Sequence, residues 1–101
     1  MGLTDRFRAS ETAHVHDAFR RAGFRVEHTS GGCRCFRRDL EGEVWIVTLE
    51  EDPDLPRSFA GEITIGIYPR ENWEECGGSK PRLQVVRTVR AFLDQLASGT
   101  F

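Results

Sequence analysis

The six residues from 44 to 49 constrain the fold of this chain more than any other feature. Their sequence, Val-Trp-Ile-Val-Thr-Leu, is the most β-prone run in the chain and is apolar at odd and even positions alike. A strand with this pattern buries both of its faces. We therefore predict that residues 44–49 form a central strand, and that the rest of the chain builds a sheet and a covering layer around it.

Three further segments show the two-residue period of half-buried strands. Residues 24–29 alternate apolar and polar side chains, and residues 33–38 follow them as a second strand. Ser30-Gly31-Gly32 between them predicts a hairpin, because glycine adopts the positive φ of tight turns. Residues 39–42 predict another tight turn, and residues 61–68 alternate again, with three isoleucines on one face. Together these patterns predict a four-stranded antiparallel meander.

Apolar residues at three- and four-residue spacing predict two helices. The first covers residues 4–22, with Gly23 as its left-handed terminating residue. The second follows Ser79 as N-cap and carries an apolar stripe from Leu83 to Leu96. We therefore expect a single α+β domain over residues 1–101, in the order α-β-β-β-β-α, with both helices on one face of the sheet.

Composition excludes several classes of protein. The hydrophobic fraction of 39% is too high for a disordered chain, and no segment approaches the ~20 apolar residues of a membrane span. The start of the chain lacks the pattern of a secretory signal, so we expect a cytoplasmic protein with no membrane partner. The net charge of −2 produces no overall attraction to nucleic acid.

Phosphate-loop, dinucleotide and nucleophile-elbow motifs are absent from the sequence, and we expect no catalytic residue, cofactor or metal.

The cysteines and one histidine raise the alternative of a zinc- or thiol-dependent protein. A two-residue hairpin loop would place His28 on the same face as Cys33 and Cys35, with Cys76 as a possible fourth ligand, whereas a three-residue loop would move His28 to the opposite face. The sequence leaves this register at 30–32 open. One residue between two cysteines in a strand is poor geometry for a single ion, so we expect reduced structural thiols.

A cluster of arginines on the second strand suggests the alternative of a nucleic-acid-binding accessory protein. Arg34, Arg37 and Arg38 would form a basic patch that could meet phosphates or the carboxylates of a protein. No pattern of stacking aromatic residues accompanies them. We therefore favour a solvated strand face in which nearby glutamates balance these charges.

Two acidic loops, residues 50–57 and 70–80, and the outer face of the sheet are the candidate binding surfaces. Acidic loops can imitate phosphates, and a loop tryptophan such as Trp73 either folds back onto the core or anchors an interface. Trp45 and Tyr68 also lie outside the predicted core stripes. The candidate protein-binding residues are Glu50, Glu51, Asp52, Asp54, Tyr68, Trp73, Glu74 and Glu75.

The hairpin and the fourth predicted strand carry a resemblance. Residues 23–33, Arg38-Asp39-Leu40 and Ile65-Gly66-Ile67-Tyr68 look like small proteins of unknown function encoded by phages and mobile elements of GC-rich bacteria. The resemblance covers about half of the chain, transfers no catalytic residue, and moves the functional expectation only by analogy of context. It implies a protein that binds and blocks a host machine, as anti-CRISPR proteins do. Our leading hypothesis is a non-enzymatic protein-binding module, an inhibitor of a host defence complex, whose partner is another protein or protein complex. The oligomeric state is left open.

Overall fold

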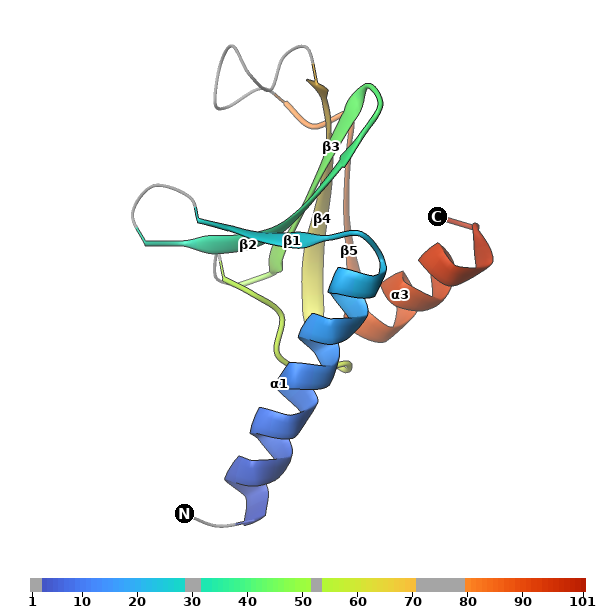
Figure 1. The fold of residues 1–101 in the computed structure, drawn as a ribbon. Helices are drawn as coiled ribbons and strands as arrows, with labels where there is room; N and C mark the ends of the chain where they lie inside the picture. The colour runs from blue at the N-terminus through green and yellow to red at the C-terminus, as the bar shows by residue number, and fades with distance from the viewer. Residues whose placement is uncertain (1–2, 29–31, 52–53, 71–79) are drawn as a thin grey trace.

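The computed structural model describes residues 3–28, 32–51, 54–70 and 80–101, with side chains from residue 10 onward (Figure 1). Within these residues the chain forms an α+β fold with a five-stranded antiparallel sheet and two helices. In chain order the elements are α1 (Leu3–Arg21), β1 (Arg25–His28), β2 (Arg34–Leu40), β3 (Glu43–Leu49), β4 (Glu62–Pro69), β5 (Leu83–Thr88) and α3 (Val89–Ser98).

The sheet is a meander in which each strand pairs with the next one along the chain. Its order is β1-β2-β3-β4-β5, so β3 is the central strand, as the sequence predicts. In the register Trp45 of β3 lies opposite Arg38 of β2 and Ile67 of β4. The sheet is strongly twisted, and β1 and β2 run across the direction of β4 and β5 (Figure 1).

The fifth strand corrects the prediction of a long C-terminal helix and a four-stranded sheet. Residues 83–88 pair with β4, so that Leu83 lies opposite Ile67 and Thr88 opposite Glu62. The helix begins only at Val89, and the Thr88 side chain caps it by accepting a hydrogen bond from the backbone N–H of Ala91. The predicted cap, Ser79, lies outside the described residues. Pairing satisfies backbone groups along β4 that would otherwise be unpaired, and this outweighs the helical spacing of Leu83 and Val86.

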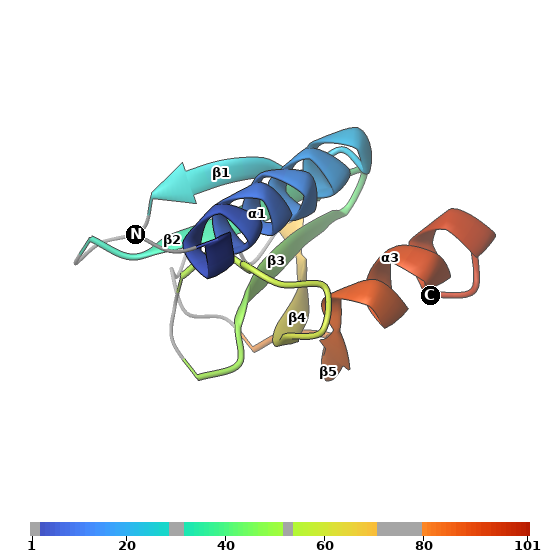
Figure 2. The same cartoon turned by 90° about the horizontal axis from the view of Figure 1, so that it is seen from below.

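Both helices contribute to one core on the same face of the sheet, as predicted. Phe19 of α1 stacks on Phe36 of β2 with ring centres 4.6 Å apart, and Phe92 of α3 approaches Phe19 at 6.1 Å. The core also includes Val47 and Ile65 from the middle of the sheet. α1 and α3 lie over the sheet without running parallel to each other (Figures 1 and 2).

The segment after β3 is part of this core, which the sequence did not indicate. Leu55 and Pro56 are buried. The carbonyl oxygen of Pro56 lies 2.9 Å from Nε2 of His16, and Thr12 donates a hydrogen bond to the carbonyl oxygen of Arg57. These contacts therefore hold this part of the acidic loop against α1.

Trp45 also belongs to the core, in agreement with the two-sided apolar pattern of residues 44–49 and contrary to its place among the candidate interface aromatics. The side chain is buried and has ring contacts with Phe92 and Phe101. Its indole N–H donates a hydrogen bond to Oε2 of Glu43 at 3.1 Å. Trp45 is therefore not available as an interface anchor.

Candidate functional site

The face of the sheet opposite the helices, called here the open face, is built from the alternate residues of all five strands. One row across it follows from the register: Arg25 lies opposite Arg37, Arg37 opposite Ile46, Ile46 opposite Gly66, and Gly66 opposite Gln84. The row passes from charged residues on β1 and β2 to uncharged residues on β3, β4 and β5. The open face therefore has a charged half and a less polar half.

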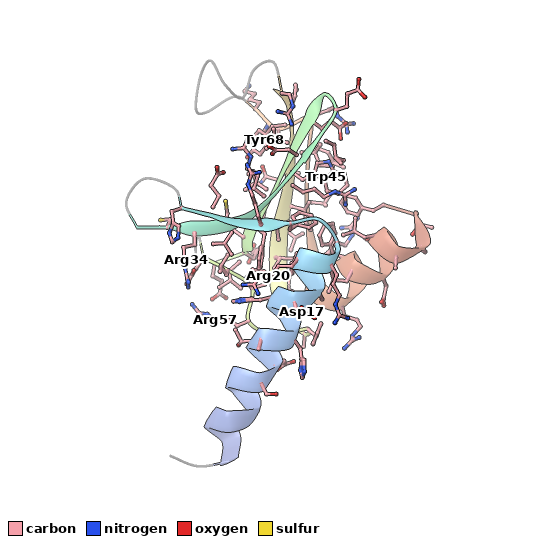
Figure 3. The ribbon with its side chains drawn as sticks, viewed as in Figure 1. Asp17, Arg20, Arg34, Trp45, Arg57 and Tyr68 are labelled. Atoms are coloured by element: carbon pink, nitrogen blue, oxygen red, sulfur yellow. The ribbon has the colours of Figure 1, made fainter. Side chains whose placement is uncertain are left out.

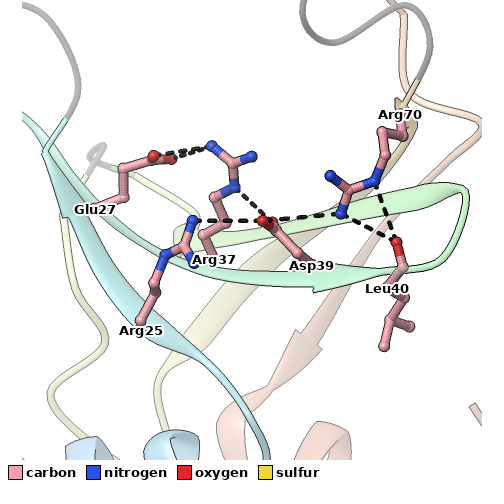
Figure 4. A network of polar contacts seen from close by, with 6 residues as sticks. All are labelled: Arg25, Glu27, Arg37, Asp39, Leu40 and Arg70. Atoms are coloured by element: carbon pink, nitrogen blue, oxygen red, sulfur yellow. Dashed lines mark hydrogen bonds and ion pairs between the residues drawn. The ribbon is translucent and has the colours of Figure 1, made fainter.

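The charged half is a connected set of ion pairs centred on Arg37 (Figure 4). Arg37 donates from Nη1 to Oε1 of Glu27 at 2.9 Å and from Nε to Oδ1 of Asp39 at 2.6 Å. Arg25 and Arg70 approach the other oxygen of Asp39 at 3.4 and 3.8 Å. The hydrogen bond from Arg37 holds the pKa of Asp39 below its ordinary value. We call these five residues the Arg37 network. Their charged groups pair with one another.

The less polar half of the open face includes a tightly placed tyrosine. Tyr68, one of the predicted binding residues, is half-buried and lies over Gly66 on the same strand. Ile46 on β3 is also half-buried, and Val86 on β5 is 40% exposed. Figure 3 shows Tyr68 at the end of the sheet farthest from α1.

One of the two edges of the sheet is β5, a segment whose apolar spacing predicts a helix. Leu83 and Val86 are the exposed large hydrophobic side chains of the described part of the chain, at 41% and 40%. They point to opposite faces, because Leu83 shares a face with Ile67 while Val86 lies opposite Thr64. The β-branched pair Val85-Val86, followed by Thr88, is the signal that would have indicated a strand here.

The predicted acidic loop is only partly available for binding. Asp54 accepts hydrogen bonds from Nε of Arg34 at 3.0 Å, from Nη2 of Arg57 at 3.1 Å and from the backbone N–H of Leu55 at 2.8 Å. The Leu55 N–H contributes most to lowering the pKa of Asp54 to about 2, followed by Arg34. Glu50 and Glu51 are exposed. The remaining predicted residues, Asp52, Trp73, Glu74 and Glu75, lie outside the described residues.

The three arginines of the nucleic-acid hypothesis do not form one patch. Arg37 lies on the open face in its network, whereas Arg34 and Arg38 lie on the face that the helices cover. Arg34 pairs with Asp54. The guanidinium group of Arg38 lies over the rings of Phe24 and Trp45. A nucleic acid would therefore not find these three charges side by side.

The hairpin register separates the residues of the zinc hypothesis. Glu27 lies opposite Cys35 and His28 lies opposite Arg34, so His28 and Cys35 are on different faces. Burial, with a smaller contribution from Glu27, raises the pKa of the Cys35 thiol to about 11, so this thiol stays protonated at neutral pH. Among the described residues no three His, Cys, Asp or Glu side chains are grouped to hold a metal ion, and Cys76 lies outside them.

Comparisons with known proteins add no relative to this description. No family model, no curated protein and no solved structure matches the chain. The resemblance to phage-encoded proteins therefore stays a hypothesis. Within the described residues, neither helix has the length and apolar character needed to cross a membrane.

Proposed function

We propose that this chain is a non-enzymatic protein-binding module that binds its partner along β5 and the adjoining open face. The observation that carries the proposal is the exposure of Leu83 and Val86 on an edge strand. Edge strands leave one row of backbone N–H and C=O groups without a strand partner, and a partner strand can add to that row. On β5 the exposed Arg87 side chain donates to the carbonyl oxygen of Val86 at 2.8 Å, and an added strand would displace it. Side chains on both faces of such a strand then contact the added strand.

The residues around β5 have the composition that is usual for a protein-binding surface. Protein interfaces combine an apolar centre with a polar rim. Val86 and the half-buried Ile46 and Tyr68 would supply apolar and aromatic area on the open face. The Arg37 network would supply a fixed polar margin on the far side of the same face.

Inhibition of a host defence complex is the narrower form of this proposal. The sequence resemblance supports it, together with the exposed Glu50 and Glu51, which present negative charge. Asp54 contributes little to phosphate imitation, because two arginines already hold it. The double variant Glu50→Gln/Glu51→Gln is expected to bind a cationic nucleic-acid channel more weakly. Unchanged affinity would exclude imitation of phosphates by these two residues.

The main proposal is tested by capturing partners from a lysate of the source cells. The wild-type protein and Ala13→Lys, a control at an exposed position of α1, are expected to retain the same stoichiometric partner. Val86→Lys is expected to release it, because a charge replaces the apolar contact. Hydrogen exchange on the isolated complex should show new protection of the β5 amides.

Two results would overturn the proposal. One is equal capture by Val86→Lys and Ala13→Lys, with both variants folded by circular dichroism. The other is a complex in which the β5 amides exchange as fast as they do in the free protein. If the partner is a second copy of the chain, light scattering will show a concentration-dependent dimer that Val86→Lys abolishes.

A further inference from the structure

A groove between α1 and α3 lies on the helical side of the molecule, away from the open face. It has a volume of about 590 Å³, within the roughly 300–1,000 Å³ of small-molecule sites. Its apolar wall consists of Ala18 from α1, Ala22 directly after α1, and Leu93, Leu96 and Ala97 from α3. These side chains are small or aliphatic, so they line the groove with apolar surface and leave room for a ligand.

The groove also contains the positively charged side chain of Arg38, which lies against two aromatic rings. Its guanidinium carbon lies 5.2 Å from the ring centre of Trp45 and 5.7 Å from that of Phe24, which holds the group against the core. Arg37 and Arg70, the other half-buried arginines, both approach Asp39. Among the described residues no carboxylate pairs with Arg38.

The charges at the rim restrict the ligand further. Asp17 and Arg21 both line the groove, and their charges pair with each other at 3.0 Å. His14 lines the same groove. The Asp17–Arg21 pair is neutral and no carboxylate of the described residues pairs with Arg38, so a single negative charge matches the groove, whereas a dianion such as a phosphate monoester would keep one charge uncompensated.

The length of the apolar wall favours a small molecule over a bound helix. Ala18 to Ala22 and Leu93 to Ala97 each cover about one helical turn, or ~6 Å along the helix axis. A docked helix presents anchors over two or more turns. A single alkyl chain, which needs no second turn of anchors, fits the available wall.

We infer that this groove binds a small monocarboxylate with an apolar body. The carboxylate accepts two parallel hydrogen bonds from the guanidinium group of Arg38, and the apolar body lies along the wall formed by Ala18, Leu93 and their neighbours. This site is separate from β5 and independent of the proposed function.

Titration with decanoate, followed by amide resonances of the intact protein, tests the inference. Decanoate is expected to shift the amides of Ala18, Ala22, Leu93 and Leu96, and decan-1-ol to bind about 10- to 100-fold more weakly, because it lacks the charge-assisted hydrogen bonds. Arg38→Gln is expected to weaken decanoate binding by a similar factor and to leave decan-1-ol binding unchanged. Arg20→Gln, at an exposed position of α1, should bind decanoate like the wild type.

A second variant keeps the test valid if Arg38→Gln does not fold. Ala97→Trp fills the groove from an exposed position and leaves Arg38 in place, so it should abolish decanoate binding without lowering stability. Absence of decanoate-induced shifts at the groove in the wild type would overturn the inference. Equal affinity for decanoate and decan-1-ol, or unchanged decanoate binding in Ala97→Trp, would overturn it as well.

Discussion

A side-chain Cβ atom on Gly66 would lie 2.9 Å from Cε1 of Tyr68, because the tyrosine ring occupies the space above this glycine. The two residues are two positions apart on β4 and share the open face. The absence of a side chain at Gly66 thus determines where the Tyr68 ring lies. Gly66 has a packing role in this strand.

Gly66→Ala is the first prediction. The new methyl group must displace the Tyr68 ring, so we expect a loss of about 1 kcal/mol in the free energy of unfolding. In a Tyr68→Ser background the same change should cost almost nothing, because the ring is absent. Urea denaturation of the four proteins of this cycle measures the coupling. Additive costs would show that the ring does not occupy this space.

Asp54→Asn is the second prediction, and it concerns stability against pH. The pKa of Asp54 falls from 3.8 to about 2 on folding, so the ionised form stabilises the folded state above pH 4. The side chain is 28% exposed, and allowing for solvent screening we expect the variant to lose about 1 to 2 kcal/mol at pH 7.

The difference between wild type and Asp54→Asn should shrink as the pH falls from 4 to 2, because the wild-type carboxylate becomes protonated in both states. Denaturation at pH 7, 4 and 2.5 measures it. Glu51→Gln, at an exposed position, is the matched control and should change stability little at any pH. A difference that is constant with pH would contradict the role of the ionised Asp54.

The third prediction is that Cys35 resists alkylation in the folded protein. Its thiol is buried and its pKa is raised to about 11, and the thiolate is the reactive form. With iodoacetamide at pH 7.5, peptide mass spectrometry should find Cys35 unmodified under conditions that modify it fully in urea. Equal rates in the folded and unfolded protein would contradict this environment.

The fourth prediction concerns the Arg37 network. Arg37→Met leaves Glu27 and Asp39 without their central cation, so we expect a loss of about 1 to 3 kcal/mol and a rise in the pKa of Asp39. Denaturation measures the stability, and a carboxyl NMR titration measures the pKa. Arg25→Met is the control, and because its side chain is 62% exposed it should cost less than about 1 kcal/mol. Equal losses in the two variants would contradict the central place of Arg37.

Local patterns were sufficient for most elements of the fold. The apolar stripe around Val15 and Phe19 predicts α1, and Gly23, with φ of 93°, ends it as expected. The two-sided apolar run at 44–49 predicts the central strand. These features depend on neighbours within a few residues, so the sequence displays them directly.

Residues 83–88 show where local patterns fail. Leu83 and Val86 have the spacing of a helix stripe, but the segment pairs with β4 as the edge strand. Backbone pairing with a segment about 20 residues away decides this, and no window of the local sequence contains that information. The candidate binding surface on β5 was missed for the same reason.

The sequence by itself determined the class of fold, the central strand, the first helix and the antiparallel order of the meander, because periodicity and glycine placement act locally. Only the tertiary structure decided the hairpin register that separates His28 from Cys35, the burial of Leu55 and Pro56, and the pairing of Asp54 with Arg34. It likewise left Arg38 without a carboxylate among the described residues. These features depend on which distant segments meet, and packing and backbone hydrogen bonding across the whole sheet settle that together.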